Sequence, residues 1–243
     1  MKIHPRMMLV LAAILLLPSA GCQKATPEIS VPKERALDPE VARRPGVAEI
    51  RKLGGQIKVD EDKPDKPIIE VYLTSTKISD AGLAALAAWT EVRLLDLSGT
   101  KVTDAGLQHL KGLTQLQSLY LAFTPITGDG LKSLSKLSQL QVLDLNKTRV
   151  TDSALKHLKQ WSKLQSVSLV ETPITDAGLV YLGAIPSLER LDLSLTPITD
   201  KGVEHLQRLT RLNSLSLHYT QVSEAGREQL QKKLPKAKIN MNQ

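Results

Sequence analysis

The sequence predicts an α/β solenoid, in which one strand and one short helix repeat along the chain and stack side by side. Apolar residues alternate in short runs, such as Leu119 and Leu121, which is the period of a strand with one buried face. Others recur at helical spacing, such as Leu107, Leu110 and Leu113. The register is set by a threonine every 24 residues: Thr76, Thr100, Thr124, Thr148, Thr172, Thr196 and Thr220. No single unit can bury its own apolar residues, so stacking must provide the core.

The first 21 residues have the layout of a secretory signal peptide. Lys2 and Arg6 precede an apolar run from Met7 to Leu17, and small residues follow. The run is too short to span a membrane as a helix. We therefore expect residues 1–21 to be removed and the protein to be exported to the cell envelope, on its periplasmic or cell-surface side.

Cys22 is the only cysteine of the chain, so no intrachain disulfide can form. Its position after Ala20 and Gly21 resembles the bacterial lipobox, although Ser19 stands where that motif prefers leucine. The resemblance implies that Cys22 is lipidated and anchors the protein to a membrane. The alternative is an ordinary signal peptide with an incidental cysteine.

Three segments flank or cap the repeats. Residues 22–37 have little apolar content and are expected to form a flexible tether. Residues 38–67 are expected to cap the N-terminal end, with a helix that starts at Asp38-Pro39, a break at Pro45-Gly46 and a strand over residues 56–60. Residues 227–243, which end in an Ile239/Met241 pair, are expected to close the other end.

The threonine column is expected to be structural, with hydroxyls that tie neighbouring turns together. After each turn, a Thr-Asp pair or a relative of it suits a helix start: the hydroxyl would cap an amide, and the carboxylate would lie on the positive end of the helix dipole. The third copy has Gly128-Asp129 in place of Asp-Ala, and the fourth has Ala154 in place of glycine.

The repeated pattern Leu-x-x-Leu-x-Leu-x-x-Thr-x-Ile-Thr-Asp-x-Gly-Leu-x-x-Leu-x-x-Leu resembles leucine-rich repeat proteins, closest to the subtype with a helical convex side. Threonine stands where that family usually has asparagine or cysteine. The resemblance covers seven repeats over residues 68–226. It implies a horseshoe with about eight parallel strands on the concave face, short helices on the convex face, and partners bound in the hollow.

Candidate partner-binding residues lie on the outward strand positions and beside the threonine column, where four of the seven aromatic residues project among charged ones. Exposed aromatics among charges are typical of a protein-interaction surface, although chance placement is an alternative. The candidates are Tyr72, Asp96, Tyr120, Phe123, Asp144, Asn146, Lys147, Arg149, Glu171, Asp192, His218 and Tyr219. The two tryptophans, Trp89 and Trp161, are expected to pack in the core.

The sequence argues against an enzyme, a metal site and a cofactor. The histidines at equivalent helix positions (His109, His157, His205) are two repeats apart, roughly 10 Å, whereas zinc needs its ligands within about 2.1 Å of one point. Asp96, Asp144 and Asp192 have the same spacing and point in parallel. Removal of the signal peptide would lower the net charge from +7 to +5, mostly at the C-terminal cap, which does not indicate nucleic-acid binding.

These observations predict a monomeric, non-catalytic protein-binding or scaffolding domain, without a cofactor, whose protein partner the sequence does not identify. Two alternatives remain open. The concave face could bind a glycan or a small ligand, or the domain could be a purely structural protein of the envelope.

Overall fold

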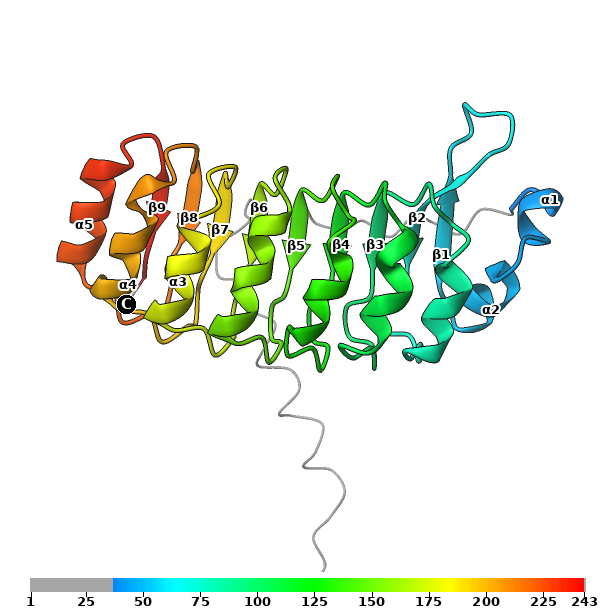
Figure 1. Cartoon of the computed structure of the whole chain (residues 1–243), viewed down its shortest axis with the longest axis horizontal. Helices are drawn as coiled ribbons and strands as arrows, with labels where there is room; N and C mark the ends of the chain where they lie inside the picture. The colour runs from blue at the N-terminus through cyan, green and yellow to red at the C-terminus, as the bar shows by residue number, and fades with distance from the viewer. Residues whose placement is uncertain (1–36, 243) are drawn as a thin grey trace, which may run out of the picture.

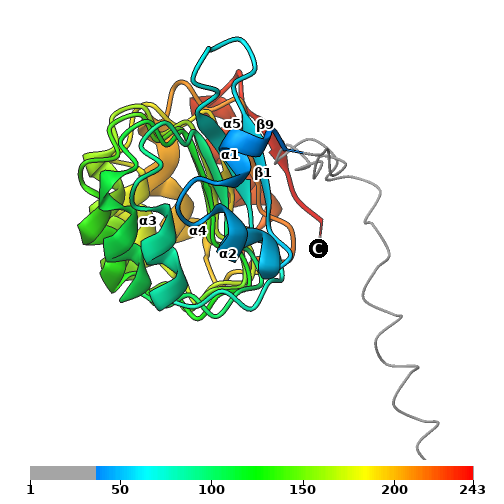
Figure 2. The same cartoon turned by 90° about the vertical axis from the view of Figure 1, so that its right-hand side faces the viewer.

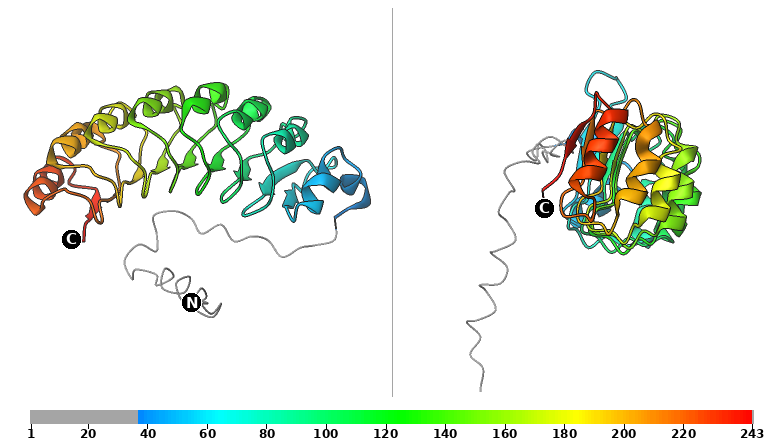
Figure 3. Two further views of the ribbon diagram at one scale, coloured as in Figure 1. Left: turned by 90° about the horizontal axis from the view of Figure 1, so that it is seen from below. Right: turned by 90° about the vertical axis from the view of Figure 1, so that its left-hand side faces the viewer.

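The computed structural model describes residues 37–242, which form a curved solenoid (Figure 1). Strands line its concave side and helical turns its convex side, as the view in Figure 3 makes plain. The end-on view in Figure 2 separates the same two layers. The α/β solenoid expected from the sequence is therefore confirmed.

Nine strands form one sheet in chain order. Their bounds are β1 Gln56–Val59, β2 Ile68–Tyr72, β3 Leu94–Asp96, β4 Ser118–Tyr120, β5 Val142–Asp144, β6 Ser166–Ser168, β7 Arg190–Asp192, β8 Ser214–Ser216 and β9 Lys238–Asn240. Strands β2 to β9 are parallel, as the sequence predicted, and β1 adds an antiparallel strand at the N-terminal edge.

The convex layer consists of short helices, many of them 3₁₀ helices, which suit runs of a few residues. They are α1 Pro39–Ala42, α2 Val47–Lys52, η1 Ala81–Leu86, η2 Gly106–Gly112, η3 Asp129–Leu134, η4 Asp152–Gln160, α3 Asp176–Leu182, α4 Asp200–Val203, η5 Glu204–Arg208 and α5 Glu224–Lys233. The break between α1 and α2 contains Pro45 and Gly46, where the sequence placed it. The indole of Trp89 joins this region to the first repeat by donating from Nε1 to the Pro45 carbonyl at 3.1 Å.

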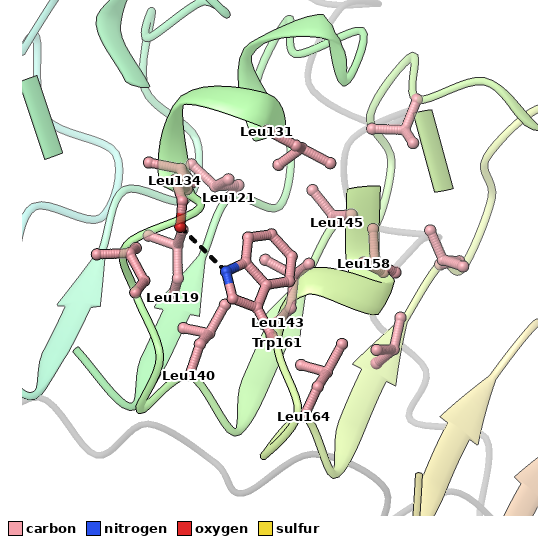
Figure 4. Close-up of a cluster of buried hydrophobic side chains, with 14 of the residues drawn as sticks. Leu119, Leu121, Leu131, Leu134, Leu140, Leu143, Leu145, Leu158, Trp161 and Leu164 are labelled. Atoms are coloured by element: carbon pink, nitrogen blue, oxygen red, sulfur yellow. Dashed lines mark hydrogen bonds between the residues drawn. The ribbon is translucent and has the colours of Figure 1, made fainter. Parts of the chain in front are cut away.

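A continuous apolar core fills the space between the layers. The leucines of the repeated frame are buried, and Trp161 is fully buried among them (Figure 4). Its Nε1 donates to the Leu134 carbonyl of the preceding repeat at 3.1 Å. The prediction that both tryptophans pack in the core is confirmed.

The threonine column closes turns within each repeat. Every Thr hydroxyl of the column donates to the carbonyl of the leucine three residues earlier, at 2.5–2.8 Å. In the first two repeats the threonine amide donates to that same carbonyl. The prediction that the hydroxyls tie neighbouring turns together is therefore wrong: the nearest acceptor belongs to the threonine's own turn.

Neighbouring repeats are joined instead by the aspartate at the helix start. Asp80 accepts from the amide of Thr103 at 2.7 Å and from its hydroxyl at 2.6 Å, one repeat further on. The same pair of bonds recurs between Asp104 and Thr127, Asp152 and Thr175, Asp176 and Thr199, and Asp200 and Ser223. The expected capping of the helix by the hydroxyl does occur at Thr175, Thr199 and Ser223. The carboxylate, however, serves the next repeat.

This bond explains the glycines of the helices. A Cβ on Gly202 would lie 2.3 Å from Asp176 Oδ1, and Gly106, Gly178 and Gly226 meet the aspartate of the preceding repeat in the same way. In the third repeat Gly128 replaces the aspartate, and the next repeat has Ala154 in place of the glycine. A Cβ on Gly128 would lie 2.3 Å from the Ala154 Cβ. The two departures from the repeat, Gly128 for aspartate and Ala154 for glycine, therefore compensate each other. The methyl group of Ala154 occupies the space that the carboxylate fills in the other repeats.

We predict that Gly202→Ala lowers the free energy of unfolding by about 1–3 kcal/mol, because the new methyl group meets the Asp176 carboxylate. The double variant Asp176→Gly/Gly202→Ala recreates the Gly128/Ala154 pair. Its loss of stability should be smaller than the sum of the two single losses by about 1 kcal/mol or more. Urea unfolding of the four proteins measures this coupling, and strictly additive losses would contradict the interpretation.

Candidate functional site

The candidate site is the row of residues directly before the threonine column, which we call the rim. It consists of Ser75, Gly99, Phe123, Lys147, Glu171, Leu195 and Tyr219. Each rim residue follows the end of a strand, and its amide donates to a carbonyl of the next repeat, as Phe123 does to Asn146 at 2.9 Å. The rim therefore runs along the edge of the solenoid at which the parallel strands end.

Every rim residue has a left-handed backbone, with φ between 52° and 68°. The rim is the third residue of a turn that begins at the leucine and ends at the threonine, a position where positive φ favours glycine or asparagine. Only Gly99 satisfies this preference. Each of the other side chains costs about 1 kcal/mol of conformational strain.

Three rim side chains are large, apolar and exposed. Phe123 is 60%, Leu195 46% and Tyr219 59% exposed, and within residues 37–242 only Val180 and Tyr181 on α3 join them as exposed large hydrophobics. A stable fold requires neither the apolar character nor the strain at these positions. This combination marks the rim as a candidate interaction surface.

The two charged rim residues lie between the apolar ones and contact each other. Lys147 Nζ is 3.0 Å from Glu171 Oε2 and lies over the Phe123 ring, 5.0 Å from its centroid. Both charged side chains are largely exposed, so the pair contributes little to stability. It does fix the positions of a cation and an anion in the middle of the rim.

The outward strand column does not offer the exposed aromatics that the sequence suggested. The strand register aligns Tyr72, Asp96, Tyr120 and Asp144 across neighbouring strands, as expected. Tyr72 and Tyr120 are nevertheless only 6% and 3% exposed. Side chains on strands about 4.8 Å apart converge on the concave side and cover one another, so a residue that points outward is still buried here.

The three aspartates of this column each stabilise their own turn, and Asp96 also accepts from the Thr74 hydroxyl of the preceding repeat at 2.5 Å. Asp96, Asp144 and Asp192 each accept a hydrogen bond from the amide two residues later, at 2.9–3.0 Å. Asp96 and Asp192 are buried. These carboxylates therefore initiate the turns that carry the rim, and the sequence-based assignment of Asp96 and Asp192 to an exposed binding surface is wrong.

The other candidates differ in what their side chains do. Asn146 Oδ1 accepts from the Ser168 hydroxyl and the Val170 amide, at 2.6 and 2.7 Å, and so joins two repeats. His218 is partly buried, and its Nδ1 has no hydrogen-bond partner within the described part of the chain. Arg149 is exposed beside the rim, two residues after Lys147.

The sequence-based candidates do not include Leu195, because they are aromatic or polar residues and leucine is also the core residue of the repeat. Its position 24 residues after Glu171 and 24 before Tyr219 was the signal that could have identified it. The exposed prolines two residues beyond the rim, Pro125, Pro173 and Pro197, were missed as well.

Burial raises the pKa of Asp144 to about 6, and the nearby Asp96 and Asp192 carboxylates contribute to the rise. Burial likewise raises the pKa of the Tyr72 and Tyr120 hydroxyls. The Tyr72 hydroxyl donates to Glu70 at 2.5 Å. The concave column is therefore a set of internally bonded or shielded polar groups, whereas the rim is open to a partner.

The family model described as "Leucine Rich repeat" matches residues 92–111, 112–135 and 184–206. Internalin C2 from Listeria monocytogenes has a similar structure, with a TM-score of 0.56 and 22% sequence identity over 72% of this chain and 81% of that one. At this identity the similarity concerns the fold alone.

A second internalin from the same organism has a TM-score of 0.47 and 18% identity, over 84% of this chain and 75% of that one. No curated protein matches the chain. Within residues 37–242, no helix has the length and apolar character needed to cross a membrane. The signal peptide, Cys22 and most of the tether lie outside the described residues.

We predict that Asp144→Asn raises the free energy of unfolding at pH 7 by about 1–3 kcal/mol. The folded protein holds the carboxyl proton up to about pH 6, whereas the unfolded chain releases it near pH 3.9. The free-energy cost of burying the ionised carboxylate is therefore absent below about pH 4, grows between pH 4 and 6, and stays constant above pH 6. Asparagine keeps the oxygen that accepts from Asn146. Urea unfolding across this range should show the difference between the two proteins disappear at low pH. A difference that is constant with pH would contradict the prediction.

We predict that Leu195→Gly leaves the free energy of unfolding unchanged or raises it by up to about 1 kcal/mol, because glycine relieves the left-handed strain at an exposed position. Leu193→Gly, two residues earlier and fully buried, is the control and should cost several kcal/mol. Thermal or urea unfolding compares them. A large loss in Leu195→Gly would assign this side chain to the stability of the fold.

Proposed function

We propose that this chain, which is a leucine-rich repeat protein, is a non-catalytic protein-binding module that acts through its rim. The observation that carries the proposal is the presence of Phe123, Leu195 and Tyr219 at strained, exposed positions. Aromatic and apolar anchors beside charged residues are typical of the energetically important part of a protein interface.

The rim suits binding because the fold holds it rigid. Its backbone is fixed by the turn around the threonine hydroxyl and by hydrogen bonds to the next repeat. A partner would therefore pay little ordering entropy on this side of the interface. The leucine two residues before each rim residue, such as Leu121 before Phe123, is fully buried and ties the turn to the core.

The concave column supports ligand binding less well. Sugar recognition needs accessible aromatic faces, and the rings of Tyr72 and Tyr120 are buried. The carboxylates of Asp96 and Asp192 already accept hydrogen bonds within their turns. These contacts favour a protein partner at the rim over a glycan or a small ligand in the hollow.

The proposal includes an organisation of the whole chain: a signal peptide over residues 1–21, a tether over residues 22–37 after a lipidated Cys22, an N-terminal cap over 38–67, repeats over 68–226 and a C-terminal cap over 227–243. It is supported by the sequence layout. In this arrangement the tether would present the rim at some distance from a membrane of the cell envelope.

Site-specific photocrosslinking in the native host tests the proposal. A photoreactive residue at Leu195 should give a defined protein adduct, whereas the same residue at Val180, which is 50% exposed on the convex side, should not. Adding Phe123→Ser and Tyr219→Ser should reduce the adduct. Identical adduct patterns at both positions, or no adduct at either, would contradict a binding function of the rim.

A further inference from the structure

We propose that the rim binds the rim of a second copy of this chain, in a dimer with two-fold symmetry. This inference rests on the proposed function, since it names the partner of the same surface. It contrasts with the monomer expected from the sequence. The order of apolar and charged residues along the rim supports this dimer.

The central four rim residues are self-complementary. They are apolar, positive, negative and apolar: Phe123, Lys147, Glu171 and Leu195. A two-fold axis midway between Lys147 and Glu171 places each lysine opposite a glutamate of the second copy. The same axis places Phe123 opposite Leu195. The interface would thus hold two apolar pairs around a network of four charges.

The match continues one repeat further out. There the axis places Tyr219, whose ring is 59% exposed, opposite Gly99, the smallest rim residue. Because Gly99 has no side chain, it leaves room for the Tyr219 ring, and the two rims can approach closely. Size as well as charge therefore supports this one register.

The two nearest registers bring like charges together. An axis through Lys147 would place two lysines opposite each other, and an axis through Glu171 would place two glutamates there. Both arrangements are unfavourable for charges in close contact. Registers further along the rim, such as an axis through Phe123, pair neither charge with its opposite. The axis between Lys147 and Glu171 is therefore the only two-fold register of the rim that pairs both charges with opposite charges.

The shape of the solenoid permits this pairing. Rim residues recur at the strand spacing of about 4.8 Å in both copies, so the pairs stay in step. The rim follows the arc seen in Figure 3. Rotation about an axis that points from the convex to the concave side reverses the direction of the rim but preserves its curvature. The two edges can therefore meet along their length.

The next row of the edge is compatible with the same axis. It contains exposed prolines and charged residues two positions beyond the rim. The axis places Arg149 opposite Pro173 and Pro125 opposite Pro197. Lys101 falls opposite Gln221. No like charges meet, and the prolines extend the apolar area of the contact.

The rim edge is also the unobstructed one. The connection between β1 and β2, residues 60–67, lies at the edge where the parallel strands begin, and Figure 1 shows it projecting beyond the solenoid there. The rim lies at the opposite edge. Within residues 37–242, this loop would obstruct a full-length contact at that edge near its N-terminal end, whereas no such loop projects from the rim edge.

The contact would be small. The exposed rim and its prolines supply about ten residues per copy, against about 20–30 in a standard interface. We therefore expect a weak dimer, with a dissociation constant in the micromolar range. Its population should depend on protein concentration.

Charge reversal on the full chain, followed by sedimentation velocity at about 1–200 µM, tests the proposal. Lys147→Glu and Glu171→Lys should each weaken self-association at least about tenfold, because like charges then face each other. A mixture of the two single variants should form a heterodimer, since one rim is then doubly negative and the other doubly positive. The double variant Lys147→Glu/Glu171→Lys should recover the homodimer.

Lys159→Glu, an exposed charge reversal on the convex side, is the control and should change nothing. Circular dichroism confirms that each variant is folded. A wild type that stays monomeric at every concentration, or single variants that associate as the wild type does, would overturn the dimer. If Leu195 still crosslinks to a different protein, the proposed binding function stands without the dimer. If it crosslinks to nothing, both fail.

Discussion

The hydrogen bonds between an aspartate of one repeat and the hydroxyl and amide of the next are the contact on which the regular stacking depends. Asp176 accepts from both the amide and the hydroxyl of Thr199. Its carboxylate lies so close to residue 202 that this residue must be glycine. Burial acts to raise the pKa of Asp104, but the hydrogen bonds from Thr127 and Gly130 outweigh it and hold that pKa below its ordinary value. The ionised form is therefore the one that the structure stabilises. Where the carboxylate is missing, at Gly128, the Ala154 methyl group occupies its space and the Trp161 indole donates to the Leu134 carbonyl, while the strand pairing keeps its register.

This regular stacking leaves one position per repeat with little role in the core. The leucine two residues before each rim residue fills the core and the threonine after it closes the turn, so the rim residue lies exposed on a left-handed backbone. Stability would favour glycine at each of these positions, and six of the seven are occupied by something else. Since the cost is about 1 kcal/mol at each one, the fold does not explain the choice of side chain. The rim is consequently the part of the surface where the sequence departs furthest from what stacking alone requires.

The fold could be predicted in detail because the 24-residue period identifies equivalent positions in every repeat. These positions give the strands, the buried leucines and the strand register. The site could be predicted only in part. The sequence predicts four of the rim residues as candidates: Phe123, Tyr219, Lys147 and Glu171. It does not predict Leu195, because leucine is also the core residue of the repeat. The burial of Tyr72 and Tyr120 could not be predicted from the alternation of apolar and polar residues along the strands. That alternation indicates which face a side chain lies on, but not how closely its neighbours cover it. The left-handed turn was equally out of reach, since Phe and Leu give no local signal for positive φ.

The same physics is the reason for proposing a binding surface at the edge of the sheet and not in the hollow. A concave parallel sheet brings the side chains of each column together, so polar groups there satisfy one another: Asn146 joins two repeats, and Asp192 accepts from the Ser194 amide and hydroxyl. Such groups would have to break internal hydrogen bonds before they could bind a partner. Rim side chains are exposed and, apart from the Lys147–Glu171 pair, make no such bonds within residues 37–242. A partner therefore gains more at the rim than in the hollow for the same number of contacts. In a solenoid whose concave face is closed by its own side chains, recognition is favoured where the strands end.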